Sequence, residues 1–142
     1  MYPGNYAKQH PDRPAVIMAQ SGEVLTYAAL EARANQLAHL LRSQSLAASD
    51  HYSIFMENNC EYMETCAAGE RTGLYYTCIN SYLTAPELAY ILQNSESKVL
   101  ITSKAKLDIA LEAVADCPMV QLVLVVGAVS YTHLRAHETV SD

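Results

Sequence analysis

Four short apolar segments, separated by stretches with helical spacing, constrain the fold of this chain more than any other feature. Each segment is mainly hydrophobic and does not alternate regularly with polar residues, which is typical of strands buried on both faces of a parallel sheet. The segments are residues 52–56, 74–79, 98–102 and 121–126. The order predicts a β-α-β-α-β-α-β unit of α/β class, with parallel strands, helices on both faces and right-handed crossovers.

A hairpin and a helix are predicted before this unit. Two β-type runs, residues 15–18 and 23–27, flank a turn that contains Gly22. Thr26 is a candidate N-cap for a helix over about residues 27–43. One apolar stripe at helical spacing supports this helix; it comprises Leu30, Ala34, Leu37, Ala38 and Leu41.

Local signals predict where three later helices begin or end. Gly73 is placed to end the first of them in the left-handed conformation. Thr84-Ala-Pro-Glu87 has the pattern of a capping box at the start of the second, which runs to Asn94. Ser103 is predicted to cap the third, which must end before Pro118.

Composition narrows the class of protein. The 142 residues, 51% of them hydrophobic, are enough for one domain with a core, and the net charge of -6 argues against nucleic acid or an anionic membrane as partner. The longest apolar run is about half of what a membrane span needs, so no transmembrane segment is predicted. Four cysteines form no CxxC pair, and no secretory signal opens the chain. A cytoplasmic protein with reduced cysteines is therefore predicted.

Open α/β sheets bind ligands at the carboxyl ends of their strands. The predicted strands here are followed by Glu57-Asn58-Asn59, Asn80-Ser81, Thr102-Ser103 and Gly127. No GxGxxG or GxxxxGK[ST] motif occurs there. Asn58, Asn80 and Ser103 could bind a ligand, but Asn and Ser are also ordinary turn and cap residues, and that interpretation is favoured. No histidine is linked by sequence spacing to Cys60 or Cys66. The residues therefore predict no catalytic, cofactor-binding or metal-binding side chain.

The stretch from Ser130 to Asp142 allows three interpretations. His133 and His137 on one face of a helix could bind a metal with a third ligand, although Glu138 lies outside the pair. The stretch could also be a polar helix or a frayed tail. The favoured hypothesis is a non-native segment, because the stretch resembles translated sequencing adapter. The predicted division is residues 1–128 as one domain and residues 129–142 as an exposed, loosely attached tail without function.

Three stretches resemble the AMP-forming adenylating enzymes. They are "HPDRPAV" (10–16), "GEVLTYAALEARANQLAHLLRS" (22–43) and the segment from "IFMENN" to "SESKVLITS" (54–103), which is similar to acyl-CoA synthetases in particular. The resemblance covers about residues 5–127. It implies the first part of a larger adenylating domain whose parent uses ATP, Mg²⁺ and coenzyme A to activate a fatty or similar hydrophobic acid.

The resemblance assigns no catalytic residue to this chain. No stretch resembles the family's SGTTGxPKG-like phosphate loop, so a piece with scaffold but without activity is expected. An incomplete sheet with an open hydrophobic edge also predicts poor solubility or a dye-binding state. A stand-alone flavodoxin-like binding or regulatory module is the alternative. A metal-dependent hydrolase built on His133 and His137 is the third hypothesis.

Overall fold

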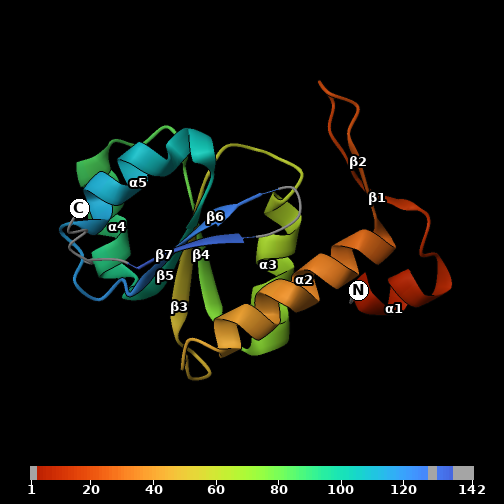
Figure 1. The fold of residues 1–142 in the computed structure, drawn as a ribbon, viewed down its shortest axis with the longest axis horizontal. Helices are drawn as coiled ribbons and strands as arrows, with labels where there is room; N and C mark the ends of the chain where they lie inside the picture. Colours follow the sequence, from red (N-terminus) through yellow and green to blue (C-terminus); the bar gives the residue numbers. More distant parts are fainter. Residues whose placement is uncertain (1–2, 128–130, 136–142) are drawn as a thin grey trace. The chain divides into compact units, whose positions relative to one another are not determined.

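The computed structural model describes residues 3–127 and 131–135, which belong to two compact units (Figure 1). The helical unit contains residues Met1–Ala48 and Asn58–Gly73. The sheet unit contains residues Ser49–Glu57 and Leu74–Asp142. The chain therefore leaves the sheet unit after its first strand, forms part of the helical unit, and returns for the remaining strands.

The predicted hairpin and first long helix are confirmed in the helical unit. Strands β1 (Pro14–Ile17) and β2 (Val24–Thr26) pair antiparallel, and Gly22 takes a positive φ of 74° in the turn. Helix α2 (Tyr27–Arg42) begins after Thr26, whose hydroxyl accepts a hydrogen bond from the backbone N–H of Ala29 at 3.2 Å. All five residues of the predicted apolar stripe are buried.

Helix α3 (Tyr62–Thr72) completes this unit, together with a short N-terminal helix α1 (Pro3–Gln9) that the sequence did not predict. Helix α3 begins after a turn in which the Asn59 side chain accepts the backbone N–H of Glu61 at 3.1 Å. Its end at Gly73, with φ of 76°, is as predicted. A small core joins the hairpin to α2 and the start of α3; it is formed by Leu25, Leu30 and Cys60.

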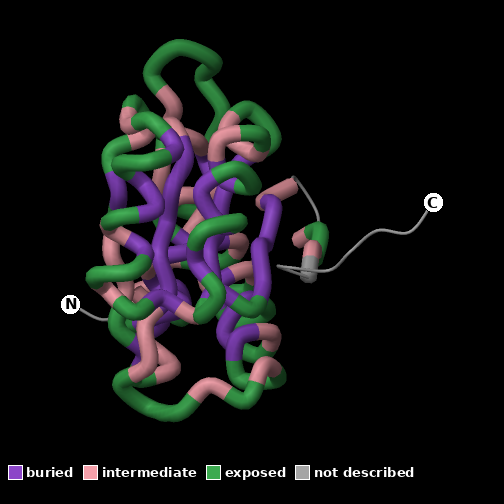
Figure 2. The backbone as a smooth tube through the Cα atoms, turned by 90° about the vertical axis from the view of Figure 1, so that its left-hand side faces the viewer, coloured by how far each residue is buried: buried purple, intermediate pink, exposed green. Residues whose placement is uncertain are grey.

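The sheet unit holds the four predicted strands in the order β4-β3-β5-β6, with a fifth strand, β7 (Tyr131–Arg135), beside β6. Strands β3, β4, β5 and β6 are parallel to one another, as the sequence predicted. Their bounds are His51–Phe55, Tyr75–Ile79, Ser97–Thr102 and Leu122–Val126 respectively. Nearly every residue of β3 and β5 is buried. Figure 2 shows the buried stretches of the backbone in purple.

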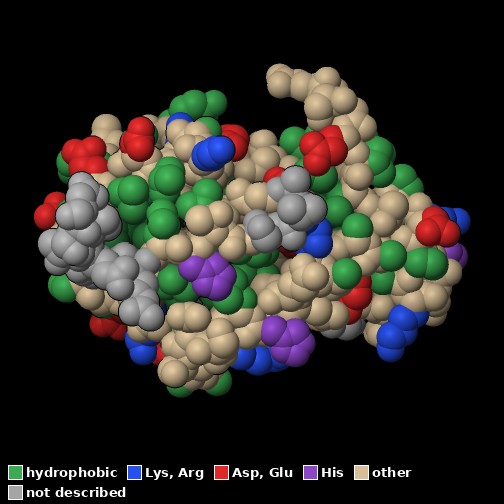
Figure 3. Space-filling model, in the orientation of Figure 1, with side chains coloured by type: hydrophobic (Ala, Val, Ile, Leu, Met, Phe, Trp, Pro, Cys, Tyr) green, Lys and Arg blue, Asp and Glu red, His purple; other side chains and the backbone are tan. Residues whose placement is uncertain are grey.

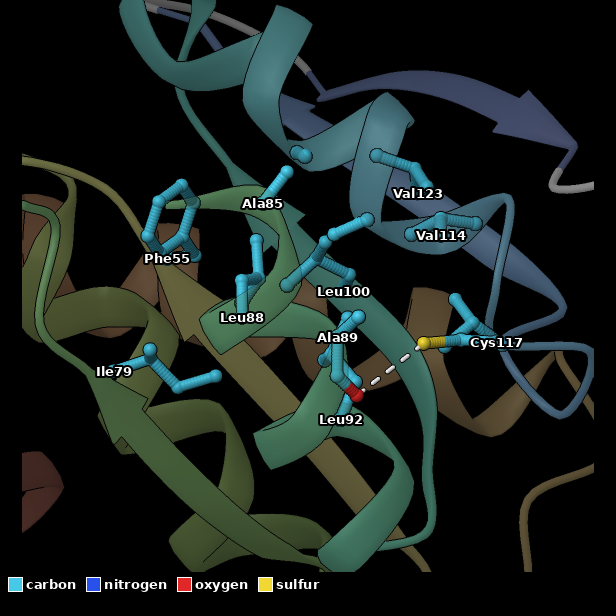
Figure 4. Close-up of a cluster of buried hydrophobic side chains, with 13 residues drawn as sticks. Phe55, Ile79, Ala85, Leu88, Ala89, Leu92, Leu100, Val114, Cys117 and Val123 are labelled. Carbon is cyan, nitrogen blue, oxygen red and sulfur yellow. Dashed lines mark hydrogen bonds between the residues drawn. The ribbon is translucent and has the colours of Figure 1, made fainter. Parts of the chain in front are cut away.

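Helices α4 (Ala85–Asn94) and α5 (Leu107–Val114) pack against the sheet through one shared cluster of buried side chains (Figure 4). Leu88 and Leu92 of α4 meet Leu100 of β5 and Val123 of β6 in this cluster. Helix α3, which connects β3 to β4, belongs to the helical unit. The sheet unit by itself therefore does not test the prediction of helices on both faces.

The start of α4 is confirmed and the start of α5 is not as predicted. The capping box forms, and the backbone N–H of Thr84 donates to the Glu87 carboxylate at 3.1 Å. This hydrogen bond holds the pKa of Glu87 below its ordinary value. Ser103 makes no capping bond, and a short 3-10 helix, η1 (Lys104–Lys106), precedes α5.

The described part of the C-terminal stretch is a strand, which neither helical interpretation of it predicted. Residues Tyr131–Arg135 form a strand, β7, which pairs antiparallel with β6 over its whole length. A helix is therefore wrong for these five residues, and so is the prediction that they are loosely attached. His137 and Glu138 lie outside the described residues, and the origin of residues 129–142 stays a prediction.

Candidate functional site

The carboxyl edge of the sheet brings Glu57 and Ser103 together. Phe55 of β3 and Thr102 of β5 are paired in the parallel register, so the residues that follow them emerge side by side. The Ser103 hydroxyl donates to the Glu57 carboxylate at 2.6 Å. The Thr102 hydroxyl donates to the carbonyl of Phe55, also at 2.6 Å. The sequence placed both residues at strand ends, but their contact depends on the strand order, which the sequence did not predict.

This pair has the chemistry of a positioning contact rather than of a nucleophile with its base. Ser103 is only 4% exposed, so its oxygen is not accessible to a substrate. Its proton is directed at a carboxylate, and a carboxylate is a weak base for a serine hydroxyl. The hydrogen bond instead fixes the orientation of the half-buried Glu57 side chain at the end of β3.

The two candidate asparagines take different places. The Asn80 side chain accepts the backbone N–H of Tyr82 at 2.9 Å, a turn contact that supports the favoured interpretation. Asn58 is exposed in the helical unit. It lines a hollow of about 450 Å³ beside the hairpin turn, together with Ile17, Met18, Ala19, Gln20 and Ser21.

The two buried cysteines, Cys60 and Cys117, have the chemistry of packing residues. Burial, followed by a hydrogen bond with Glu23, raises the pKa of Cys60 to about 11. Burial also raises the pKa of Cys117. The Cys117 thiol donates a hydrogen bond to the carbonyl oxygen of Ala89, at 3.5 Å. A thiol with a raised pKa is a poor nucleophile at neutral pH. All four cysteines are free thiols.

The described residues offer neither a metal cluster nor, on the face drawn in Figure 3, a basic patch for phosphate. Within residues 3–127 and 131–135, no group of three His, Cys, Asp or Glu side chains is arranged to hold a metal ion. His133 lies in strand β7, which contradicts the hypothesis that places it on a helix with His137. On the face drawn in Figure 3, acidic and basic side chains are interspersed and form no single basic patch.

The residues at the carboxyl edge do not fit ATP with its magnesium ion. Such a ligand needs backbone N–H groups from a glycine-rich loop, cationic side chains on the phosphates and free carboxylates for the metal. In the described part of the chain, no glycine-rich loop follows a parallel strand, and the Glu57 carboxylate already accepts the Ser103 hydroxyl. Lys106 lies over the ring of Tyr82, 5.5 Å from its centroid. No step of nucleotide chemistry is therefore assigned to these residues.

Solved structures with a similar α/β fold include carboxylic acid ligases. The Mycobacterium tuberculosis fatty acyl CoA synthetase matches 89% of this chain with a TM-score of 0.75 and 29% identity, over 26% of its own length. An anthranilate CoA ligase matches 89% of the chain with a TM-score of 0.81. At 19% identity, the second match shows a common fold only.

The family model for AMP-binding enzymes matches residues 5–141, and the chain belongs to this family. The match extends past Gly127, where the resemblance was expected to end. A 3-oxocholest-4-en-26-oate–CoA ligase of Rhodococcus rhodochrous is 34% identical over 116 residues, and a medium/long-chain-fatty-acid–CoA/3-oxocholest-4-en-26-oate–CoA ligase of Mycobacterium tuberculosis (strain ATCC 25618 / H37Rv) is 33% identical over the same length. Each alignment covers 82% of this chain but only 20% and 21% of the relative. The chain therefore spans about a fifth of the length of these relatives.

Proposed function

We propose that this chain is the scaffold part of an acid–thiol ligase that activates a fatty or similar hydrophobic carboxylic acid. The observation that carries the proposal is the AMP-binding family match over residues 5–141. Relatives named as CoA ligases of steroid and medium- or long-chain fatty acids support the hydrophobic substrate class. The same match favours a ligase over a stand-alone flavodoxin-like module.

The proposed reaction has two steps in the parent enzyme. A carboxylate oxygen attacks the α-phosphorus of ATP and displaces pyrophosphate, which converts a poor electrophile into an acyl-adenylate. The thiol of coenzyme A then attacks the acyl carbon, loses its proton and displaces AMP. Stabilising the phosphate charge needs a cation-rich, preorganised site. We assign that site to parts of the parent that this chain lacks, so the chain alone is expected to be inactive.

The cellular compartment, the partners and the domain bounds of the parent enzyme are also proposals. Four free cysteines are compatible with a reducing compartment, which supports the proposal of a cytoplasmic protein. Among the described residues, no helix has both the length and the apolar character needed to cross a bilayer. The proposed partners are the acid, ATP with Mg²⁺ and coenzyme A, without nucleic acid. Residues 1–128 are proposed as the native domain segment and residues 129–142 as a non-native addition.

A chimeric enzyme tests the scaffold role. Residues 1–127 would replace the matching segment of the M. tuberculosis ligase, which is 33% identical. The chimera is expected to keep ATP–pyrophosphate exchange that depends on a fatty acid, whereas the isolated 142-residue chain should show none above a vector control. The matched control is the same chimera with Leu88→Asp, which places a charge in the buried cluster. A folded chimera without exchange, or an active isolated chain, would contradict the proposal.

A further inference from the structure

The outer edge of β6 carries a strand whose side chains contribute little to the sheet. All five residues of β6 pair with β7, from Leu122 with Arg135 to Val126 with Tyr131. Thr132 and His133 are nevertheless exposed, and Tyr131 is only half-buried. Backbone hydrogen bonds, which any extended segment can supply, therefore account for most of this pairing.

Leu134 of β7 is partly buried and contacts the core. It lies opposite Val123 in the register and packs against the buried cluster beneath α4 and α5. Thr132 shares this face of the strand, because alternate residues point to the same side. One aliphatic side chain therefore anchors β7 to the core.

Strand β6 has the burial of an interior strand. Leu122, Val123, Leu124 and Val125 are all buried, and Val123 and Leu124 have no exposed surface. The opposite edge strand, β4, is different, since Tyr75 and Cys78 are exposed. A strand like β6 needs a neighbour on both sides to satisfy its backbone groups and cover its side chains.

We propose that the outer edge of β6 is a strand-acceptor site for an extended, antiparallel peptide segment. The site selects for one aliphatic residue opposite Val123 and is otherwise tolerant of sequence. In this chain residues 131–135 are the segment seated there, through Leu134. This is the β-strand addition mode of peptide recognition, in which backbone bonds give affinity and one side-chain position gives selectivity.

The test weakens the contact of β7 with the site in the 142-residue chain and adds the segment as a separate peptide. Leu134→Asn removes the anchor, and His133→Asn is the matched control at an exposed neighbour. The probe is a fluorescent peptide, Ser-Tyr-Thr-His-Leu-Arg-Ala, with the sequence of residues 130–136. A second peptide carries Asn in place of Leu. Fluorescence anisotropy measures binding, and hydrogen exchange measures the protection of amides in β6.

The Leu134→Asn chain is expected to bind the Leu peptide at least about tenfold more tightly than the Asn peptide, because the partly buried leucine packs against the core cluster. The wild-type and His133→Asn chains should bind neither peptide, since their own strand is present at high effective concentration. Exchange in β6 should accelerate in Leu134→Asn alone and slow again when the Leu peptide is added.

Three results would overturn the proposal. They are no binding of the Leu peptide, equal binding of the two peptides, or unchanged exchange in β6 of Leu134→Asn. If Leu134→Asn loses the sheet unit altogether, failure of excess Leu peptide to restore protection counts against the proposal as well.

Discussion

At the scale of single residues, polar groups at the strand ends are bonded within the chain rather than directed at a ligand. Ser103 donates to Glu57, and Asn80 accepts from Tyr82. Thr102 donates to a backbone carbonyl of the neighbouring strand. These bonds satisfy groups that would be costly to bury alone. Side chains of the types that often form binding sites therefore stabilise the ends of β3, β4 and β5 in this chain.

The cysteines give a prediction at this scale. Reaction with a maleimide at pH 7.5 should modify the exposed Cys78 first, and Cys60 and Cys117 only after denaturation. The reason is that the thiolate reacts, and the pKa of Cys60, raised to about 11 by burial and by Glu23, keeps its thiol protonated at this pH. Mass spectrometry of peptides measures the order.

The matched control for this order is Cys78→Ser, which should abolish the fast phase of modification. Raising the pH should accelerate modification of Cys60 in the folded chain only as the pH approaches about 11. Fast modification of Cys60 at pH 7.5 in the folded chain would show that its thiol is neither buried nor protonated as the structure indicates.

At the scale of elements, two ion pairs join α2 to α3. Arg33 donates to Glu64 at 2.6 Å, and the side chains are only 17% and 1% exposed. Arg71 pairs with Glu31 and also donates to the Asn35 side chain. Removing one member of a buried pair leaves a charge in the interior, whereas replacing both members by apolar residues of similar volume is far less costly.

We predict that Arg33→Met lowers the free energy of unfolding by about 3 kcal/mol. The double variant Arg33→Met/Glu64→Met should lose less than the single one. The control Gln36→Met, exposed on the same helix, should change stability by less than about 0.5 kcal/mol. Urea denaturation followed by circular dichroism measures all three. A double variant that is less stable than Arg33→Met would show that the pair stabilises this unit by itself.

Elements with strong local signals were predictable from sequence, and those set by tertiary context were not. The apolar runs of β3 to β6, the stripe of α2 and the Thr84–Glu87 box each carry their own signal. Strand β7 does not, because "YTHLR" has no continuous apolar run and forms a strand only against β6. Helix α1 opens with Pro-Gly and shows no apolar periodicity. Ser103 had the signal of a cap, but Glu57 from another strand competes for its hydroxyl.

At the scale of the whole molecule, the sequence motifs did not define the candidate site, because none of them tells which strand ends lie side by side. The sequence correctly placed Glu57 and Ser103 at strand ends, but the order β4-β3-β5-β6 that makes β3 and β5 neighbours is a property of the folded sheet. The family followed from three quoted stretches and is confirmed by the match over residues 5–141. The chain spans about a fifth of the length of the relatives it matches.

The edges of the sheet give the last prediction. Among the described residues, β7 covers the outer edge of β6, but no strand pairs with the outer edge of β4. Tyr75 on β4 is 58% exposed. An unpaired edge with exposed aromatic side chains is a template for association between chains. We therefore expect the 142-residue chain to form oligomers and to bind a hydrophobic dye at about 100 μM.

Placing a charge on this edge should reverse the association. Tyr75→Lys is expected to raise the monomer fraction several-fold, because a lysine on an edge strand disfavours pairing with a second copy. Tyr90→Lys is the matched control, since Tyr90 on α4 is 68% exposed and lies outside any strand. Sedimentation velocity measures the species, and dye fluorescence reports exposed apolar surface. A wild-type chain that sediments as a monomer and does not bind the dye would refute the prediction, and an equal effect of the two variants would place the association elsewhere than the β4 edge.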